Sequence, residues 1–257
     1  MNRKPNNLLG FLAKTKTTIV LLSVVFFFVS SATQISAQKK FSKTYPTSKN
    51  VRLQLTNRSG TVTVEGWDRP EIRISAYMEI PAATVEPQSL SNKIYINLVE
   101  ANQGRNVGNV NFIINVPYSS SVDIETKMGN LNVSNVRGTL VRAHISTEGD
   151  ITLTNINAGV VAAENGIGDI FFDGSIQREG SYSFKSTRGR INLRIPFDSS
   201  FRLVATAPST RDISLGAFSG GNMNFVGNGR RVVGIVGDGS ATLTVTNQRG
   251  NISFIRR

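Results

Sequence analysis

The sequence predicts an all-β protein whose strands stack as a β-solenoid, with coils of about 20 residues and a β cap at the N-terminal side. Two observations lead to this prediction. A five-residue unit that starts with glycine recurs at a nearly fixed period, and an alternating apolar pair precedes each unit. A third observation agrees with them, because apolar residues at helical spacing are missing after residue 37.

The recurring unit consists of Gly, a polar residue, an apolar residue, a second polar residue and a second apolar residue. It begins at Gly60, Gly129, Gly149, Gly168, Gly189 and Gly250. Units in the middle of the chain are 20, 19 and 21 residues apart, and the interval of 61 residues before the last unit corresponds to about three periods. Phe171 is the one apolar residue at a polar position of the unit. The period predicts stacked copies of one small strand-turn-strand element.

An apolar pair at alternating positions lies shortly before each glycine. The pairs are Leu53/Leu55, Val122/Ile124, Ala143/Ile145, Val161/Ala163, Tyr182/Phe184 and Leu243/Val245. Two more coils are predicted between Gly189 and Gly250, with Phe201/Leu203 leading to Ile213/Leu215 and Met223/Phe225 leading to Val233/Ile235. Because side chains alternate between the two faces of a strand, both apolar pairs of a coil should point inward. Ile151, Ile170 and Ile191 are therefore expected to be buried.

Residues 1–37 have the order of segments that is typical of a secretory signal peptide. Four basic residues precede an apolar run from Thr17 to Val29, and small residues follow it, so cleavage is expected after Ala37 or, second, after Ala32. An uncleaved membrane anchor is the alternative. Export would place the protein in the periplasm, at the cell surface or outside the cell. No second apolar stretch long enough to span a membrane follows.

The remaining chain is predicted to form one continuous domain with two regions. Residues 38–117 obey the repeat rule loosely and are interpreted as an N-terminal β cap, with a separate small sandwich as the alternative. Residues 118–257 are interpreted as the solenoid repeats.

Composition excludes several classes of function. The chain contains no cysteine, which excludes disulfides, thiolate metal sites, a cysteine nucleophile and a lipidated cysteine. The net charge is +12, and the predicted cleavage removes four cations and no acids, which leaves +8. This charge favours anionic partners such as phosphorylated glycans, acidic polysaccharides or lipid headgroups. No motif of nucleic-acid recognition accompanies it, so specific nucleic acid binding is not expected.

Three features resemble a widespread bacterial family of candidate adhesins, a β-strand-repeat domain of unknown function. They are the Gly-polar-Ile-polar-Leu unit, the segment LTNRSGTVTVEGWD from Leu55 to Asp68, and the Val116-Pro117 pair before the repeats. The chain is similar also to auto-transporter adhesin head domains, over roughly residues 50 to 255. The resemblance implies a right-handed β-helix-like fold and a role in adhesion. It implies no ligand and no set of functional residues.

The acidic residues of the repeats and the single histidine are the candidates for metal binding or catalysis. Asp150 and Asp169 hold the same repeat position, with Glu148 and Glu164 nearby, and such a cluster could bind Ca²⁺. The Gly-Asp pair is also common in turns, and this interpretation is favoured. His144 alternates with inward-facing residues and is expected to face solvent. No catalytic, cofactor-binding or metal-ligating residue is predicted.

The densest group of basic residues gives the one candidate site. Lys185, Arg188, Arg190 and Arg194 are predicted to form a face for an anionic ligand, because guanidinium groups bind phosphate and carboxylate groups. The alternative is a solvated surface that protects the C-terminal edge of the stack from aggregation. Trp67 is open to two interpretations, stacking on a sugar ring or packing within the cap.

The sequence therefore favours an exported, non-catalytic, adhesin-like or scaffold protein that binds an anionic glycan, an envelope polymer or a protein partner. A carbohydrate-active enzyme on a β-helix scaffold is the first alternative. It would need converging carboxylates that the repeat register does not provide. An accessory or structural protein of the cell envelope is the second alternative.

Overall fold

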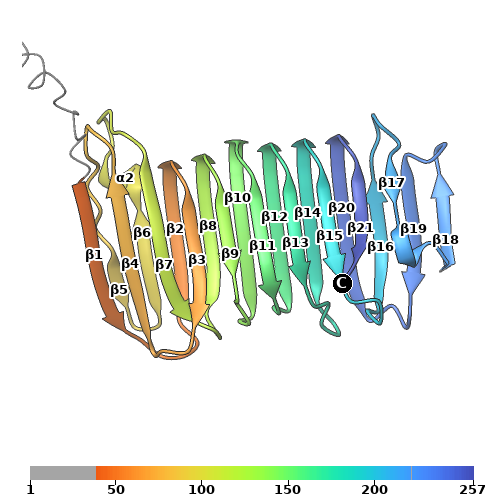
Figure 1. The fold of residues 1–257 in the computed structure, drawn as a ribbon, viewed down its shortest axis with the longest axis horizontal. Coiled ribbons are helices and arrows are strands. Elements are labelled where there is room, and N and C mark those ends of the chain that lie inside the picture. The colour runs from red at the N-terminus through yellow and green to blue at the C-terminus, as the bar shows by residue number, and fades with distance from the viewer. Residues whose placement is uncertain (1–38, 221) are drawn as a thin grey trace, which may run out of the picture. The chain divides into compact units, whose positions relative to one another are not determined.

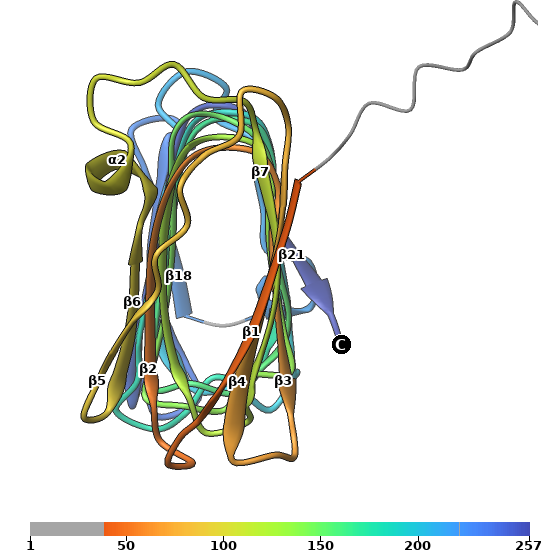
Figure 2. The ribbon, with the colours of Figure 1, turned by 90° about the vertical axis from the view of Figure 1, so that its left-hand side faces the viewer.

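A computed structural model describes residues 39–220 and 222–257 of the unit Gln38–Arg257. The predicted signal peptide, residues 1–37, lies outside the described residues. The unit consists of two large β-sheets that face each other, and Figure 2 shows them edge-on. Two short helices, α2 (Leu98–Ala101) and η1 (Gly216–Phe218), interrupt the strands. The predicted all-β class is confirmed.

Ten strands form one sheet, here named sheet A. In spatial order they are β1 (Lys39–Pro46), β4 (Glu71–Met78), β7 (Val110–Pro117), β3 (Val62–Trp67), β9 (Leu131–Ser134), β11 (Ile151–Ile156), β13 (Ile170–Gly174), β15 (Ile191–Ile195), β21 (Ile252–Arg256) and β17 (Ile213–Ser214).

Eleven strands form the opposite sheet, here named sheet B. In the same direction along the stack they are β5 (Gln88–Leu90), β6 (Lys93–Asn97), β2 (Arg52–Ser59), β8 (Ser121–Met128), β10 (Leu140–Glu148), β12 (Val160–Ile167), β14 (Ser181–Arg188), β20 (Ala241–Arg249), β16 (Phe201–Thr206), β19 (Arg231–Val236) and β18 (Asn222–Val226).

Each period of the sequence gives one strand to each sheet. β10 and β11 form one such coil, and β12 and β13 form the next, with parallel pairing in both sheets (Figure 1). Equivalent residues stand side by side, as in the pair Ile151 and Ile170. Antiparallel pairing occurs near the two ends of the stack, between β1, β4 and β7, between β5 and β6, and between β16, β19 and β18.

The core lies between the two sheets and runs along the stack. Ile151, Ile170 and Ile191 are all 0% exposed, so the predicted inward direction of this row is confirmed. The aromatic ring of Phe172 lies 5.0 Å from Phe184 and 6.3 Å from Tyr182, measured between ring centroids. Sheet A and sheet B are thus joined by contacts between the inward rows of neighbouring coils.

Glycine is required at the start of each repeat unit by the close approach of neighbouring coils. A Cβ atom on Gly168 would overlap the carbonyl oxygen of Gly149, and a Cβ atom on Gly189 would overlap that of Gly168. Both glycines also have a φ angle in the left-handed region, +131° and +134°. The backbone of one coil therefore occupies the space in which the next coil would carry a side chain.

The residue after each glycine links its coil to the next one. The side-chain oxygen Oδ1 of Asn130 accepts a hydrogen bond from the backbone N–H of Asp150 at 2.9 Å. Asp150 accepts from the N–H of Asp169 and Asp169 from that of Arg190, both at 2.8 Å. Asp150 and Asp169 therefore have a structural role, because each accepts a backbone hydrogen bond from the turn of the following coil. In residues 39–220 and 222–257, no three His, Asp or Glu side chains are grouped so that they could hold a metal ion.

The prediction for the interval between Gly189 and Gly250 is wrong in its order of stacking. The coil of β20 and β21 lies directly beside β14 and β15, and the earlier strands β16 and β17 lie beyond it. Met223/Phe225 and Val233/Ile235 belong to an antiparallel hairpin of β18 and β19, not to a coil. The turn Gly227-Asn228-Gly229, with positive φ at all three residues, closes this hairpin.

A similar exchange of order occurs at the N-terminal end. β2 and β3 pair with β8 and β9, although more than fifty residues separate them along the chain. The intervening strands β6 and β7 form the next parallel layer outward, and β1, β4 and β5 add antiparallel pairs. At both ends of the stack, the order of the strands in space therefore differs from their order in the sequence.

Candidate functional site

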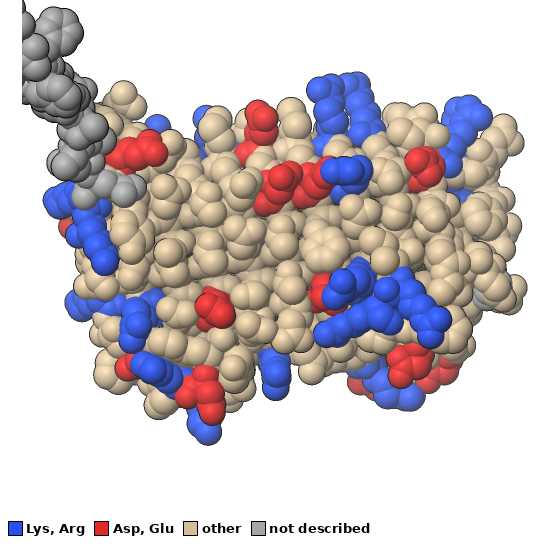
Figure 3. Space-filling model, in the orientation of Figure 1, with Lys and Arg blue, Asp and Glu red and all other residues tan. Residues whose placement is uncertain are grey.

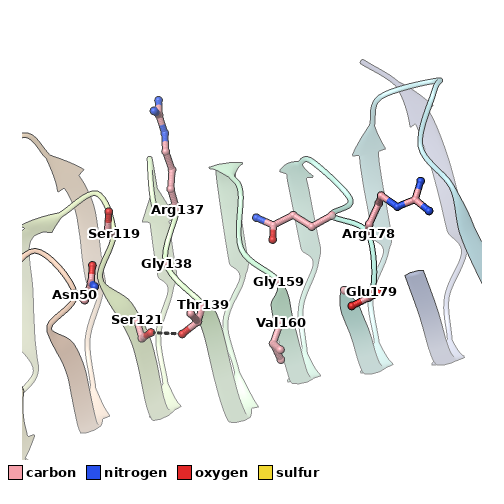
Figure 4. Close-up of a pocket in the computed structure, with 12 residues that line it drawn as sticks. Asn50, Ser119, Ser121, Arg137, Gly138, Thr139, Gly159, Val160, Arg178 and Glu179 are labelled. Carbon is pink, nitrogen blue, oxygen red and sulfur yellow. Dashed lines mark hydrogen bonds between the residues drawn. The ribbon is translucent and has the colours of Figure 1, made fainter. Parts of the chain in front are cut away.

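An open groove of about 520 Å³ crosses the corner at which the chain passes from sheet A into sheet B. We name it the corner groove, and Figure 4 shows its lining. It extends over the turns that precede β8, β10, β12 and β14, and its side chains include Ser119, Ser121, Arg137, Thr139, Arg178 and Glu179.

The groove arises from the stacking of equivalent turns. The backbone N–H of Val160 donates to the carbonyl of Thr139 at 3.0 Å, and that of Ser181 donates to the carbonyl of Gly159 at 2.8 Å. Two of the turns have a glycine at the same register position, Gly159 and Gly180, and the preceding turn has Thr139 there, so no large side chain rises from the centre of the groove. At Gly159 an added Cβ atom would meet no atom closer than 3.4 Å. The groove is open because the sequence leaves it unfilled.

The lining is polar and carries charge of both signs. The Oγ atom of Ser121 and the Oγ1 atom of Thr139 lie 2.9 Å apart. Arg137 lies over the ring of Tyr118 at 5.1 Å, and Arg178 is 3.2 Å from the carboxylate of Asp238. Because the Arg178 and Asp238 side chains are 81% and 47% exposed, water screens this pair, and a ligand could replace it at little cost.

The floor of the groove is held by a buried tyrosine. The hydroxyl of Tyr182 donates to the carbonyl of Ala158 at 2.9 Å and accepts from the backbone N–H of Gln177 at 2.7 Å. Gln177 reaches back to the preceding coil and donates to Oδ1 of Asn157 at 2.9 Å. Burial raises the pKa of the Tyr182 hydroxyl, and the hydrogen bond from Gln177 opposes that shift. These bonds keep the loop that carries Arg178 and Glu179 in place.

Replacing Tyr182 with Phe should therefore lower the free energy of unfolding by about 1–3 kcal/mol, since it leaves a buried carbonyl and a buried N–H without a partner. Denaturant unfolding followed by circular dichroism measures the change. Tyr118→Phe is the matched control, because the Tyr118 hydroxyl makes no hydrogen bond within the described part of the chain. Equal losses in the two variants would contradict this role of Tyr182.

The structure separates the four residues of the predicted basic face. Lys185 lies on β14 and faces solvent on the outer side of sheet B. Arg194 lies on β15 and faces solvent on the outer side of sheet A. Arg188 and Arg190 lie between them, at the corner around Gly189. The four side chains thus do not share one flat face.

Two of these arginines are paired within the protein. Arg190 donates through Nε to Oδ2 of Asp169 at 2.9 Å, and this hydrogen bond holds the pKa of the Asp169 carboxyl below its usual value. Arg194 donates to the buried carboxylate of Asp173 at 2.8 Å. No carboxylate among the described residues lies within 4.0 Å of Lys185 or Arg188. Arg188 is in register with Arg249 on the neighbouring coil.

The two other residues considered from the sequence, Trp67 and His144, contact neighbouring side chains or backbone of the protein itself. The indole N–H of Trp67 donates to the carbonyl of Glu71 at 2.9 Å, and Arg69 and Arg73 lie over its ring. The Nδ1 atom of His144 is 3.8 Å from Glu125, on the outer side of sheet B. In the described ranges, no helix is long and apolar enough to cross a membrane.

Sequence reasoning missed the corner groove, although a signal for it exists. Gly159 and Gly180 hold equivalent register positions just before the sheet B strands β12 and β14. Unlike Gly168, Gly159 has neither a left-handed φ angle nor a backbone atom in close contact to require it. A glycine that the backbone does not need, such as Gly159, can indicate a place kept free for another molecule.

Comparison with solved structures agrees with this architecture. A candidate cell adhesion protein from Clostridium sporogenes superposes with a TM-score of 0.52 at 13% identity, over 86% of this chain and 100% of the other. A candidate adhesin from Bacteroides fragilis gives a TM-score of 0.38 at 10% identity, over 86% and 99%. A candidate lipid binding protein from Parabacteroides distasonis gives 0.35 at 11% identity, over 85% and 97%. Only the first supports the shared fold.

Comparison of the sequence gives the family. No curated protein matches this sequence. Residues 15–254 match the family described as Toastrack DUF4097, and the resemblance to bacterial candidate adhesins is confirmed. Since the match extends over most of its length, the chain belongs to the Toastrack DUF4097 family.

Proposed function

We propose that this protein is an exported, non-catalytic, adhesin-like protein that binds an extended glycan or envelope polymer along the corner groove. The observation that carries the proposal is the open groove of about 520 Å³ that crosses four successive turns of the stack. A groove that runs across the coils suits a linear polymer, because equivalent groups recur in it about every 4.8 Å. We include in the proposal the right-handed β-helix-like course of the coils and export by residues 1–37.

The chemistry of the lining supports a ligand rich in hydroxyl and acidic groups. Ser121 and Thr139 can donate and accept hydrogen bonds, and Glu179 can accept them from sugar hydroxyls. Arg137 and Arg178 are exposed and extend from the turns, as Figure 4 shows, where they can bind carboxylate or phosphate groups. Lys185, Arg188, Arg190 and Arg194 remain a second proposed surface for acidic groups of the same polymer.

A glycan and envelope-polymer binding array with residues 38–257 tests the proposal. Gly159→Leu places a side chain in the groove where the nearest atoms leave room for it, so the fold should persist and binding should fall at least about tenfold. Gly220→Leu is the matched control, since a Cβ atom there meets nothing within 4 Å and the residue lies away from the groove. It should bind as the unmodified protein does.

The predicted basic face provides a second comparison in the same array. Arg188, Arg190 and Arg194 are changed together to Ser, and steep loss of binding at high salt is measured in parallel. Binding that survives in Gly159→Leu and disappears in the triple variant would contradict the groove and favour the basic face. Turnover of any glycan on the array would contradict a purely binding role.

A further inference from the structure

The net charge of the mature chain is concentrated at one end of the stack. Residues 39–177 contain 13 Lys and Arg and 13 Asp and Glu, so this part is neutral. Residues 178–257 contain 12 Lys and Arg and 4 Asp and Glu, so this part has a net charge of +8. It forms the strands from β14 to β21, which lie next to one another at the C-terminal end of both sheets. Figure 3 shows basic side chains gathered over the region of β15 and β21.

Few of these cations are neutralised by the protein itself. Within the described residues, four of the twelve have a carboxylate within 4.0 Å, namely Arg178, Arg190, Arg194 and Arg257. Eleven of the twelve are arginines, whose planar guanidinium groups bind phosphate oxygens in pairs. This end of the stack therefore attracts an anionic partner through groups that have no other counter-charge.

The same end carries apolar side chains that project into solvent. Sheet A ends at the two-residue strand β17, whereas the hairpin of β19 and β18 continues sheet B beyond β16 (Figure 1). Phe225 on β18 is 56% exposed, although its neighbour in the register, Val232, is buried. Val226 and Ile235 are 47% and 44% exposed. The hairpin thus presents large apolar groups that no part of the described chain covers.

Arginines bracket Val226 and Ile235 on the outer side of the hairpin, whereas Phe225 projects from its inner side together with Val232. Arg202 pairs in register with Ile235, and Arg231 pairs with Val226. Both arginines are exposed and point to the same side of sheet B as their partners. Cationic groups that flank protruding apolar groups are the arrangement with which peripheral proteins enter the headgroup region of a bilayer.

We propose that the C-terminal end of the stack docks on an anionic lipid surface, with the arginines on lipid phosphates and Phe225, Val226 and Ile235 in the acyl boundary. A soluble polyanion could use the charge, but it offers nothing to the apolar side chains. A second copy of the chain is disfavoured, because two ends of charge +8 repel each other and the remainder of the stack is neutral. The proposal is independent of the corner groove.

Vesicle co-sedimentation with residues 38–257 tests it, using phosphatidylcholine vesicles with and without phosphatidylglycerol. Binding is expected only to the anionic vesicles, and it should weaken strongly as salt is raised. The double variant Arg202→Ser with Arg231→Ser should lower the partition coefficient about tenfold or more. Phe225→Ser with Ile235→Ser, which keeps every charge, should lower it also.

A matched control removes the same amount of charge from the opposite end. Lys39→Ser with Lys40→Ser, on the exposed edge strand β1, should bind anionic vesicles as the unmodified protein does. Gly159→Leu should also retain vesicle binding, which separates this proposal from the function of the corner groove. Equal binding to neutral vesicles, no vesicle binding, or equal losses in the lysine and arginine variants would overturn the proposal.

The two other occupants give distinct results. Full retention of vesicle binding in the Phe225→Ser and Ile235→Ser variant, with competition by a soluble polyanion, would assign the surface to an acidic polymer and overturn lipid docking. A dimer seen by analytical ultracentrifugation without lipid, and lost in that variant, would assign it to a second copy and overturn lipid docking as well.

Discussion

Replacement of Phe172 with Ala should lower the free energy of unfolding by about 3–5 kcal/mol. The Phe172 side chain is 0% exposed between the two sheets and contacts the rings of Tyr182 and Phe184. Parallel pairing of β13 with β11 and β15 holds the backbone on both sides, so the structure cannot collapse into the space that the ring leaves. Denaturant unfolding monitored by fluorescence or circular dichroism measures the loss.

The adjacent residue provides the control for that experiment. Phe171 lies on the outer side of the same strand, in register with Thr152 and Asn192. Phe171→Ala deletes the same atoms from a partly exposed position, and its effect should stay within about 0.5 kcal/mol. Losses of equal size in the two variants would contradict the alternation of faces on which the whole fold depends.

Gly168→Ala should cost about 2–4 kcal/mol, an effect that combines backbone strain with steric overlap. Gly168 has a φ angle of +131°, and an added Cβ atom would overlap the carbonyl oxygen of Gly149. The same atom would lie 2.8 Å from Oδ1 of Asp150, which accepts the hydrogen bond from the backbone N–H of Asp169. The substitution therefore pushes two coils apart and also disturbs a link between them.

Gly220→Ala is the control for the glycine experiment, since a Cβ atom at Gly220 would meet nothing within 4 Å. It should leave the unfolding free energy unchanged or raise it slightly, because Ala restricts the unfolded chain more than Gly does. Thermal and denaturant unfolding should rank the two variants in the same order. A Gly168→Ala protein as stable as the control would show that the glycines of the repeat are not needed for close stacking.

The buried rows could be predicted from the sequence because strand geometry has a period of two. Ile151, Ile170 and Ile191 hold equivalent places in three repeat units, and one inward direction satisfies all of them. Local alternation fixes the face to which a side chain points. It contains no information on which strand becomes the neighbour.

The order of the coils was missed for this reason. Gly189 and Gly250 are 61 residues apart in the chain, yet a Cβ atom on Gly250 would overlap the carbonyl oxygen of Gly189. A spacing of 61 residues fits three successive coils, and it fits equally well one long segment that leaves the stack before the next coil forms. The turn at Gly227-Asn228-Gly229 was the residue-level signal that the intervening segment folds back as a hairpin.

The order of the basic residues along the chain does not give their arrangement in space. Lys185 and Arg194 are only nine residues apart, but a coil passes from one sheet to the other within that distance, so they point in different directions. The partners Asp169 and Asp173 come from the preceding coil, 21 residues earlier in each case. Pairing between coils depends on register, which the order of charges along the chain does not reveal.

The position of β20 and β21 inside the stack restricts how proteins of this design can grow. The last strands of the chain are enclosed between β14 and β15 on one side and β16 and β17 on the other. A duplicated segment that followed β21 would find no free place beside an equivalent coil, because strands already occupy both sides. Duplication of a coil between those that begin at Gly129 and Gly189 meets no such obstacle, because the strand order there follows the chain.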